Sequence, residues 1–401
     1  MIVAVFATAT IAYSVKLGDN LRYPDESEYL RLANNLATTG HYSLDGTTPT
    51  AYRPPAYPLL LATGMMLGVP ITALRVANAS TLLACMALLY LLLRKHNAAH
   101  AKLAALLIMT YPVLMYTAST FYPQIPATAI LLSALVLLFS SPVPPGNRRC
   151  IIAGILLGLT ILMVPTFGFT LVFTAVFIAA QSYNRENLRN AMLILCGAGI
   201  AIAPWVSRNA LVFNRFIPLS TNNGINLLLG NSENTTPNSG TTTDISRYDQ
   251  VARLLPEIQA NDYYCQAAIT YIKDHPFQAL KLYAGKLANY FNYQNHLFVQ
   301  SERSWIRTLS MLFSYSLLLV LALFRLAMAY HYPLLSIEKY IACLYFLHAP
   351  VSAIFFTRIR FRLPMDILLI VLAASSVIII ANYLRSRDVN TNQMNRGMPI
   401  K

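Results

Sequence analysis

The sequence predicts an all-α polytopic membrane protein with about ten transmembrane helices, juxtamembrane helices and a small extracytoplasmic domain. Of its 401 residues, 56% are hydrophobic and only 11% are charged, and the mean hydropathy is +0.49. Soluble domains carry about 25% charged residues. Apolar runs that approach the roughly 20 residues needed to cross a bilayer recur along the chain. Together these observations exclude a soluble globular protein.

Ten apolar runs are the candidate spans. Their number depends on the stretch 150–181, which carries no charge after Cys150. We divide it at Val164, Pro165 and Gly168, because proline and glycine interrupt helices. The runs lie at residues 2–17, 73–93, 101–117, 125–140, 150–164, 166–181, 191–206, 308–329, 336–357 and 365–384.

Basic residues alternate between the loops that join these runs, and this pattern predicts the orientation. With the N-terminus inside, the cytoplasmic loops and their edges hold 13 basic and 3 acidic residues, against 17 basic and 13 acidic residues outside. An excess of Lys and Arg marks cytoplasmic loops. We therefore expect both termini in the cytoplasm. The net charge of +14 is mostly this topology signal and requires no nucleic acid partner.

This orientation divides the chain into three parts. Residues 1–206 form an N-terminal membrane domain with a first outer loop at 18–72, and residues 207–307 form an extracytoplasmic domain. Residues 308–401 form the C-terminal transmembrane helices and a cytoplasmic tail. The five cysteines show no metal-ligand spacing, so no metal site is predicted, and a requirement for a divalent cation stays open. Few charges fall at span centres, which argues against an ion-coupled transporter.

The first outer loop carries an acidic pair and an arginine, each at the start of a predicted surface helix. Asp25 and Glu26 stand in the first turn of one helix, and Arg53 precedes two prolines that open the next. Acids in a first turn also complement the helix dipole, which is the structural alternative. A carboxylate base and an anion-binding arginine in one loop favour an enzyme that works at the membrane surface.

Three more arginines lie between the last two spans, in the segment TRIRFRLP at 357–364. Arg358, Arg360 and Arg362 alternate, so an extended chain would direct all three to one side. The predicted topology places them outside, where few positive charges are expected. Arginine binds phosphate bidentately through its planar guanidinium, so we interpret them as an anion site. The alternative is arginines at a helix end that reach toward the membrane surface.

With these motifs the sequence resembles bacterial members of the GT-C superfamily of membrane glycosyltransferases, which includes protein O-mannosyltransferases and the lipid A aminoarabinose transferase. The resemblance covers most of the chain and implies a polyprenyl-phosphate sugar donor and inversion at the anomeric carbon. It implies that Asp25 is the catalytic base, with Glu26 capping the helix or orienting the base, and that Arg53 contacts the lipid phosphate. It is carried by residues 24–43, 52–62, 203–231 and 360–364.

The chain also departs from this family pattern. Gln124 stands where many relatives carry an acid in the second outer loop, and Met163, Val164 and Pro165 stand where many carry an arginine. Gln124 can still bind a sugar hydroxyl. Further candidate contacts to the sugar or acceptor are Tyr52, Asn222, Asn223 and Asn226. The three asparagines are equally well explained as turn residues.

The sequence therefore predicts a glycosyltransferase of the plasma (inner) membrane, with its active site on the extracytoplasmic face. Its partners would be a polyprenyl-phosphate-linked sugar, membrane lipids and an acceptor that is an envelope glycan, a lipid or a protein. Two other functions stay open. A transporter or flippase of lipid-linked sugars would need the arginines but no base, and a polymerase or ligase of lipid-linked glycans usually lacks the acidic pair.

Overall fold

The computed structural model describes residues 1–141, 143–181, 184–294 and 305–395, and for residues 387–395 it describes the backbone alone. Within these ranges the regular elements are helices, and the one extended pairing is an isolated bridge between Ser43 and Pro49. The all-α prediction is confirmed. Residues 295–304 of the predicted extracytoplasmic domain and the terminal residues 396–401 lie outside the described residues.

A helix coincides with each predicted apolar run. The division of 150–181 is confirmed, because one helix ends at Met163 and the next begins at Phe167. The helices are α1 (Ile2–Leu17), α4 (Ile71–Leu93), α5 (Ala98–Leu107) with α6 (Pro112–Ala118), α7 (Gln124–Phe139), α8 (Asn147–Met163), α9 (Phe167–Ala180), α10 (Arg185–Phe213), α15 (Trp305–Ala327), α16 (Ser336–Ile354) and α17 (Ile359–Asn395).

The run predicted at 101–117 is not one straight helix. It bends by 73° between Ala98–Thr110 and α6. Pro112 opens α6, and proline lacks the backbone N–H that would continue the preceding helix. Among the described residues, α4, α10, Trp305–Tyr330 and Ile359–Ser386 are long and apolar enough to cross a membrane, and the bent pair gives a fifth span if it crosses as one.

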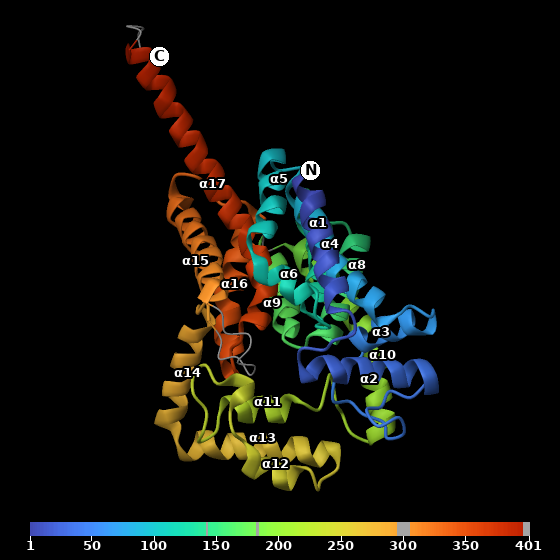
Figure 1. Cartoon of the computed structure of the whole chain (residues 1–401). Helices are drawn as coiled ribbons and strands as arrows, with labels where there is room; N and C mark the ends of the chain where they lie inside the picture. Colours follow the sequence, from blue (N-terminus) through green and yellow to red (C-terminus); the bar gives the residue numbers. More distant parts are fainter. Residues whose placement is uncertain (142, 182–183, 295–304, 396–401) are drawn as a thin grey trace.

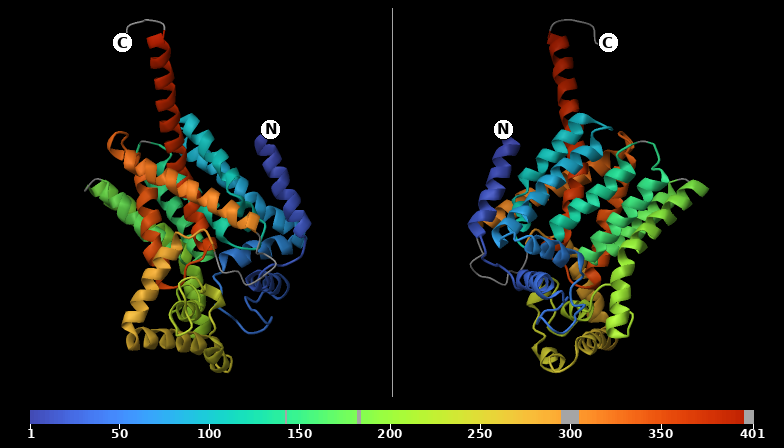
Figure 2. Two further views of the ribbon diagram at one scale, coloured as in Figure 1. Left: turned by 60° about the vertical axis from the view of Figure 1, so that its left-hand side comes forward. Right: turned by 90° about the vertical axis from the view of Figure 1, so that its right-hand side faces the viewer.

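Six further helices lie mostly across one end of this bundle. Figures 1 and 2 show the start of α1 and the end of α17 at the opposite end, with α17 extending beyond the other helices. The two segments predicted to lie outside the cytoplasm therefore gather at the same end. Their helices are α2 (Pro24–Thr39), α3 (Ala56–Met66), α11 (Asn223–Gly230), α12 (Ser246–Ala252), α13 (Glu257–Asp274) and α14 (Pro276–Tyr290).

The apolar face of α2 packs against protein. Leu32 and Ala33 are fully buried, and the ring of Tyr29 meets the ring of Tyr57 of α3 edge to face, with 5.1 Å between centroids. The helix ends at Gly40, whose φ of 74° lies in the left-handed region that glycine adopts without a side-chain clash. The helix that carries the acidic pair is thus fixed to the helix that follows Arg53.

Candidate active site

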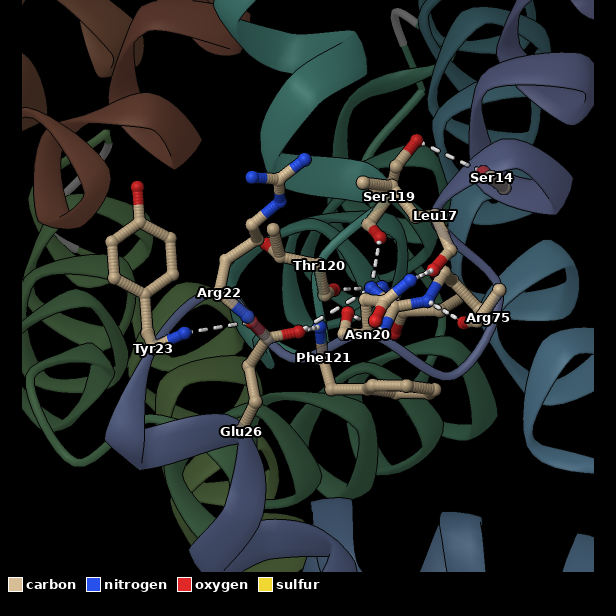
Figure 3. Close-up of polar contacts among 12 residues, drawn as sticks. Ser14, Leu17, Asn20, Arg22, Tyr23, Glu26, Arg75, Ser119, Thr120 and Phe121 are labelled. Atoms are coloured by element: carbon tan, nitrogen blue, oxygen red, sulfur yellow. Dashed lines mark hydrogen bonds and ion pairs between the residues drawn. The ribbon is translucent and has the colours of Figure 1, made fainter. Parts of the chain in front are cut away.

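Glu26 caps the start of α2. Tyr23 is extended, Pro24 opens the helix, and the Glu26 carboxylate accepts hydrogen bonds from the backbone N–H groups of Arg22 (2.7 Å) and Tyr23 (3.1 Å). Such a capping interaction satisfies N–H groups that have no partner within the helix. Figure 3 shows that Glu26 also reaches the backbone N–H of Phe121, at 2.8 Å. Glu26 is fully buried, which fits the predicted capping role.

Arg75 of α4 fixes the segment that leads into α2. Its guanidinium lies 3.4 Å from the Glu26 carboxylate and donates to the backbone carbonyls of Gly18 (2.7 Å), Asn20 (2.8 Å) and Ser119 (2.8 Å). These contacts join α1, the start of α2 and the turn before α7 (Figure 3). A buried charge is tolerated when it is paired and hydrogen-bonded, as here. Glu26 and Arg75 therefore form a structural pair that sets the position of Asp25.

Asp25 directs its carboxylate to two arginines from distant segments. Neighbouring residues on a helix point about 100° apart, so Asp25 faces away from the Glu26 network. Its Oδ1 lies 2.8 Å from Nη2 of Arg53, and its Oδ2 lies 2.8 Å from Nη2 of Arg360. The structure therefore brings Arg53 of the first outer loop and Arg360 of the loop between the last two spans to one carboxylate.

Glu28 completes this cluster, and sequence reasoning missed it. Its Oε2 accepts hydrogen bonds from Nε (2.9 Å) and Nη2 (2.5 Å) of Arg53. Residues three apart on a helix share a face, so the spacing from Asp25 to Glu28 was the available signal. We call Asp25, Glu28, Arg53 and Arg360 the Asp25 cluster. It holds two negative and two positive charges.

Aromatic rings line the Asp25 cluster. The Arg53 guanidinium lies 5.2 Å from the centroids of both Tyr29 and Tyr52, and the Arg360 guanidinium lies 4.5 Å from that of Tyr122. A cation over a ring face is attracted by the ring quadrupole. Tyr52, a predicted sugar contact, thus borders the cluster, although its role in binding is untested.

The cluster remains partly open to solvent. Side-chain exposure is 23% for Asp25, 14% for Arg53 and 24% for Arg360. Burial raises the pKa of Asp25, but the positive charges of Arg360 and Arg53 outweigh burial and hold the pKa below its usual value. Asp25 is therefore ionised and accessible, although both of its oxygens are engaged.

Arg358 and Arg362 do not join Arg360, so the prediction that all three point one way is wrong. The segment is not extended, because α17 begins at Ile359, and residues two apart on a helix point in roughly opposite directions. Arg362 pairs with Asp366 at 3.1 Å and lies 3.6 Å from the centroid of the Tyr315 ring.

Arg358 turns toward the second outer segment. Its Nη2 donates to the backbone carbonyl of Ser239 at 2.6 Å and to the hydroxyl of Thr241 at 3.2 Å. Like Arg362, it is held by groups of the protein itself. The structure therefore brings one of the three predicted arginines to Asp25.

The other predicted contacts occupy helix starts. Gln124 is the first residue of α7 and is 4% exposed, and within the described part of the chain its Oε1 accepts no hydrogen bond. Asn222 precedes α11 and accepts a hydrogen bond from the Ser220 hydroxyl at 2.9 Å. Asn223 and Asn226 lie within α11. The described residues contain no group of three or more His, Cys, Asp or Glu arranged to hold a metal ion.

Comparison with known proteins finds one family match and several similar folds. Residues 52–207, which include Arg53, match the family described as dolichyl-phosphate-mannose-protein mannosyltransferase. The fold is similar to that of the archaeal oligosaccharyltransferase AglB from Archaeoglobus fulgidus, at a TM-score of 0.52 and 14% identity. The match covers 99% of this chain and 52% of that one. The match over residues 52–207 and the shared fold support membership of the GT-C superfamily of membrane glycosyltransferases. The resemblance read from the sequence is thereby confirmed.

Two more solved structures are similar to this chain. Both are of ArnT from Cupriavidus metallidurans, one bound to undecaprenyl phosphate and one in the apo state, at TM-scores of 0.47 and 0.45. Each is 13% identical and covers 93% of this chain and 77% of that one. No curated protein matches the sequence significantly.

Proposed function

We propose that this GT-C protein transfers a sugar from a polyprenyl-phosphate donor to a hydroxyl of an extracytoplasmic acceptor, with inversion at the anomeric carbon. The observation that carries this proposal is the Asp25 cluster, in which a carboxylate and two arginines from three segments meet at one end of the bundle. The matched family is named for a dolichyl-phosphate-mannose donor, and the AglB structure contains a dolichol-phosphate.

Each residue of the cluster suits one part of this reaction. Asp25 is the base that takes the proton of the acceptor hydroxyl, a contribution of about 10²–10⁴-fold to the rate. Arg53 and Arg360 bind the donor phosphate and stabilise its negative charge as the bond to the sugar breaks. Tyr52 borders the cluster and is a proposed sugar contact. A sugar hydroxyl would also supply the donor that Oε1 of Gln124 lacks.

We further propose ten spans, with both termini in the cytoplasm of the cell and the Asp25 cluster on the outer face of the plasma membrane. The alternation of basic residues supports this orientation. The helices found at each apolar run and the gathering of α2, α3 and α11–α14 at one end are consistent with it. A reporter fused after Asn214, just beyond α10, should be periplasmic. A cytoplasmic signal there would reverse the scheme.

The acceptor is proposed to contact the segment 207–307, whose helices lie at the same end of the bundle as α2 (Figure 1). Asn222, Asn223 and Asn226 are candidates because they lie in or next to α11. A flippase is the second candidate function, since lipid-phosphate binding by arginines would serve it too. It would not require a carboxylate at position 25, and this difference separates the two functions.

The test is transfer of radiolabelled sugar from a polyprenyl-phosphate sugar by the purified protein in detergent. Asp25→Asn keeps the size and hydrogen bonding of the side chain but removes its basicity. We expect this variant to lose transfer by about 10²-fold or more while its unfolding temperature stays near that of the wild type. Asp19→Asn, which changes an exposed acid of the same loop, is the matched control. Normal turnover by Asp25→Asn would leave the transferase proposal without its base.

A further inference from the structure

The Asp25 cluster pairs the proposed base with the proposed phosphate ligands. Each oxygen of Asp25 is bound by one arginine at 2.8 Å. An arginine whose Nη2 faces Asp25 is not directed at a phosphate, and a carboxylate held by two guanidinium groups is a weak base. In this arrangement the arginines are not free to bind the donor phosphate, and Asp25 is not free to accept the proton of the acceptor hydroxyl.

Arg53 and Arg360 differ in how many carboxylates they contact. Arg53 also donates to Glu28 through both Nε and Nη2, so it keeps a carboxylate partner if its contact with Asp25 breaks. Arg360 has no ion pair in the described residues other than that with Asp25, and it rests on the ring of Tyr122. Arg360 is therefore the arginine that can move most freely from Asp25 to a ligand.

We propose that Asp25 and the donor phosphate compete for the same two arginines, and that this exchange switches on the base. The inference rests on the proposed function and concerns the regulation of that site. Donor binding moves Arg360, and in part Arg53, from the carboxylate to the phosphate oxygens. Asp25 then loses its positive neighbours and gains a negative one, and both changes strengthen its attraction for a proton.

The exchange also couples the proton transfer to Asp25 with the departure of the phosphate. The acceptor oxygen forms a bond to the anomeric carbon, and its proton passes to an Asp25 oxygen. The bond from the anomeric carbon to the phosphate oxygen breaks, and its electron pair stays on the phosphate. The cluster changes from net neutral to one net positive charge as Asp25 is protonated. That positive charge appears when the negative charge of the leaving phosphate grows, so the two events stabilise each other.

The alternative is a permanent structural ion pair, in which the arginines orient Asp25 and the phosphate binds elsewhere. The exposure of 14–24% across Arg53, Asp25 and Arg360 favours exchange, because a ligand can approach the pair without unfolding its surroundings. The pair of Glu26 and Arg75, with both side chains fully buried, is the kind of contact that such an alternative requires.

The experiment measures binding of undecaprenyl phosphate to the full chain in detergent at neutral pH. Arg53→Gln and Arg360→Gln should weaken binding by about tenfold or more, since charged hydrogen bonds to the phosphate are lost. Asp25→Asn should tighten binding by roughly threefold to tenfold, because the competing carboxylate is gone. Asp19→Asn should bind as the wild type does.

The outcomes separate this inference from the proposed function. If the two arginine variants bind less tightly but Asp25→Asn binds no more tightly than the wild type, the exchange is wrong and the phosphate site stands. If the arginine variants bind as the wild type does, the phosphate site itself is wrong. Unfolding temperatures of all variants identify any loss of binding that results from misfolding.

Discussion

Arg360 and Arg362 are two residues apart, yet their ion pairs differ in solvent exposure and in the distance along the sequence between the partners. Arg360 and Asp25 are 24% and 23% exposed, and their segments are far apart in the sequence. Arg362 and Asp366 are 1% and 0% exposed and lie one turn apart on the same helix. Arg362 also donates to the backbone carbonyls of Tyr290 and Asn292.

The partners of the two carboxylates show the same contrast. Asp366 accepts further hydrogen bonds from the hydroxyls of Tyr111 (2.9 Å) and Tyr345 (3.4 Å), so it remains held if its arginine is disturbed. Within the described residues, the side-chain contacts of the Asp25 carboxylate are those with Arg53 and Arg360. An ion pair can exchange for a ligand where it is accessible and has few other bonds. The pair of Arg362 and Asp366 instead joins α17 to α14 and α16.

The largest expected effect separates these two pairs by stability. Arg362→Gln should lower the free energy of unfolding in detergent by about 3–5 kcal/mol, because it leaves the buried Asp366 without its counter-charge. Arg360→Gln should change that free energy much less, since Arg53 still pairs with Asp25. Thermal unfolding followed by circular dichroism measures both. Equal losses in the two variants would remove the distinction between a structural and an exchangeable pair.

The pH dependence of transfer should differ between the free enzyme and its donor complex. Transfer requires ionised Asp25, so activity falls as pH drops through its pKa. Arg360 and Arg53 hold that pKa below its usual value in the free protein, which places the acidic limb of kcat/KM for the donor at low pH. In the complex the arginines face the phosphate, so the acidic limb of kcat should lie at higher pH. Coincident limbs would argue against the exchange.

Glu28→Gln should have the smallest effect of the variants in the cluster. The amide can still accept a hydrogen bond from Arg53 but no longer offsets its charge. We expect transfer to change by severalfold at most, and undecaprenyl phosphate to bind slightly more tightly because one negative charge is removed. Steady-state kinetics and binding on one preparation test this. A loss as large as that of Asp25→Asn would show that transfer needs both carboxylates, and a loss confined to Glu28→Gln would make Glu28 the base.

Much of the fold could be predicted from the sequence, because a helix that crosses lipid needs about 20 mostly apolar residues. Apolar runs identified the bundle helices, and Val164 with Pro165 marked the break between α8 and α9, whereas Gly168 lies inside α9. The bend before Pro112 was missed, although proline at that place was the available signal. Glu26 caps the start of α2, which is one of the two roles expected for it.

The site was predicted less completely, because its geometry depends on where a helix begins. Arg360 reaches Asp25 and Arg362 does not, since α17 starts at Ile359, and that start follows from packing between distant segments. The contact of Glu26 with Phe121 spans 95 positions and leaves no local pattern. Glu28 was different, because its spacing from Asp25 already placed both carboxylates on one helix face.

The most direct test of the central claim is an experimental structure of the protein with bound undecaprenyl phosphate. The account predicts that phosphate oxygens lie within hydrogen-bond distance of Arg360 and Arg53, that Oδ2 of Asp25 has lost its contact with Arg360, and that Arg53 still contacts Glu28. A phosphate bound away from these arginines, with both ion pairs of Asp25 intact, would contradict it.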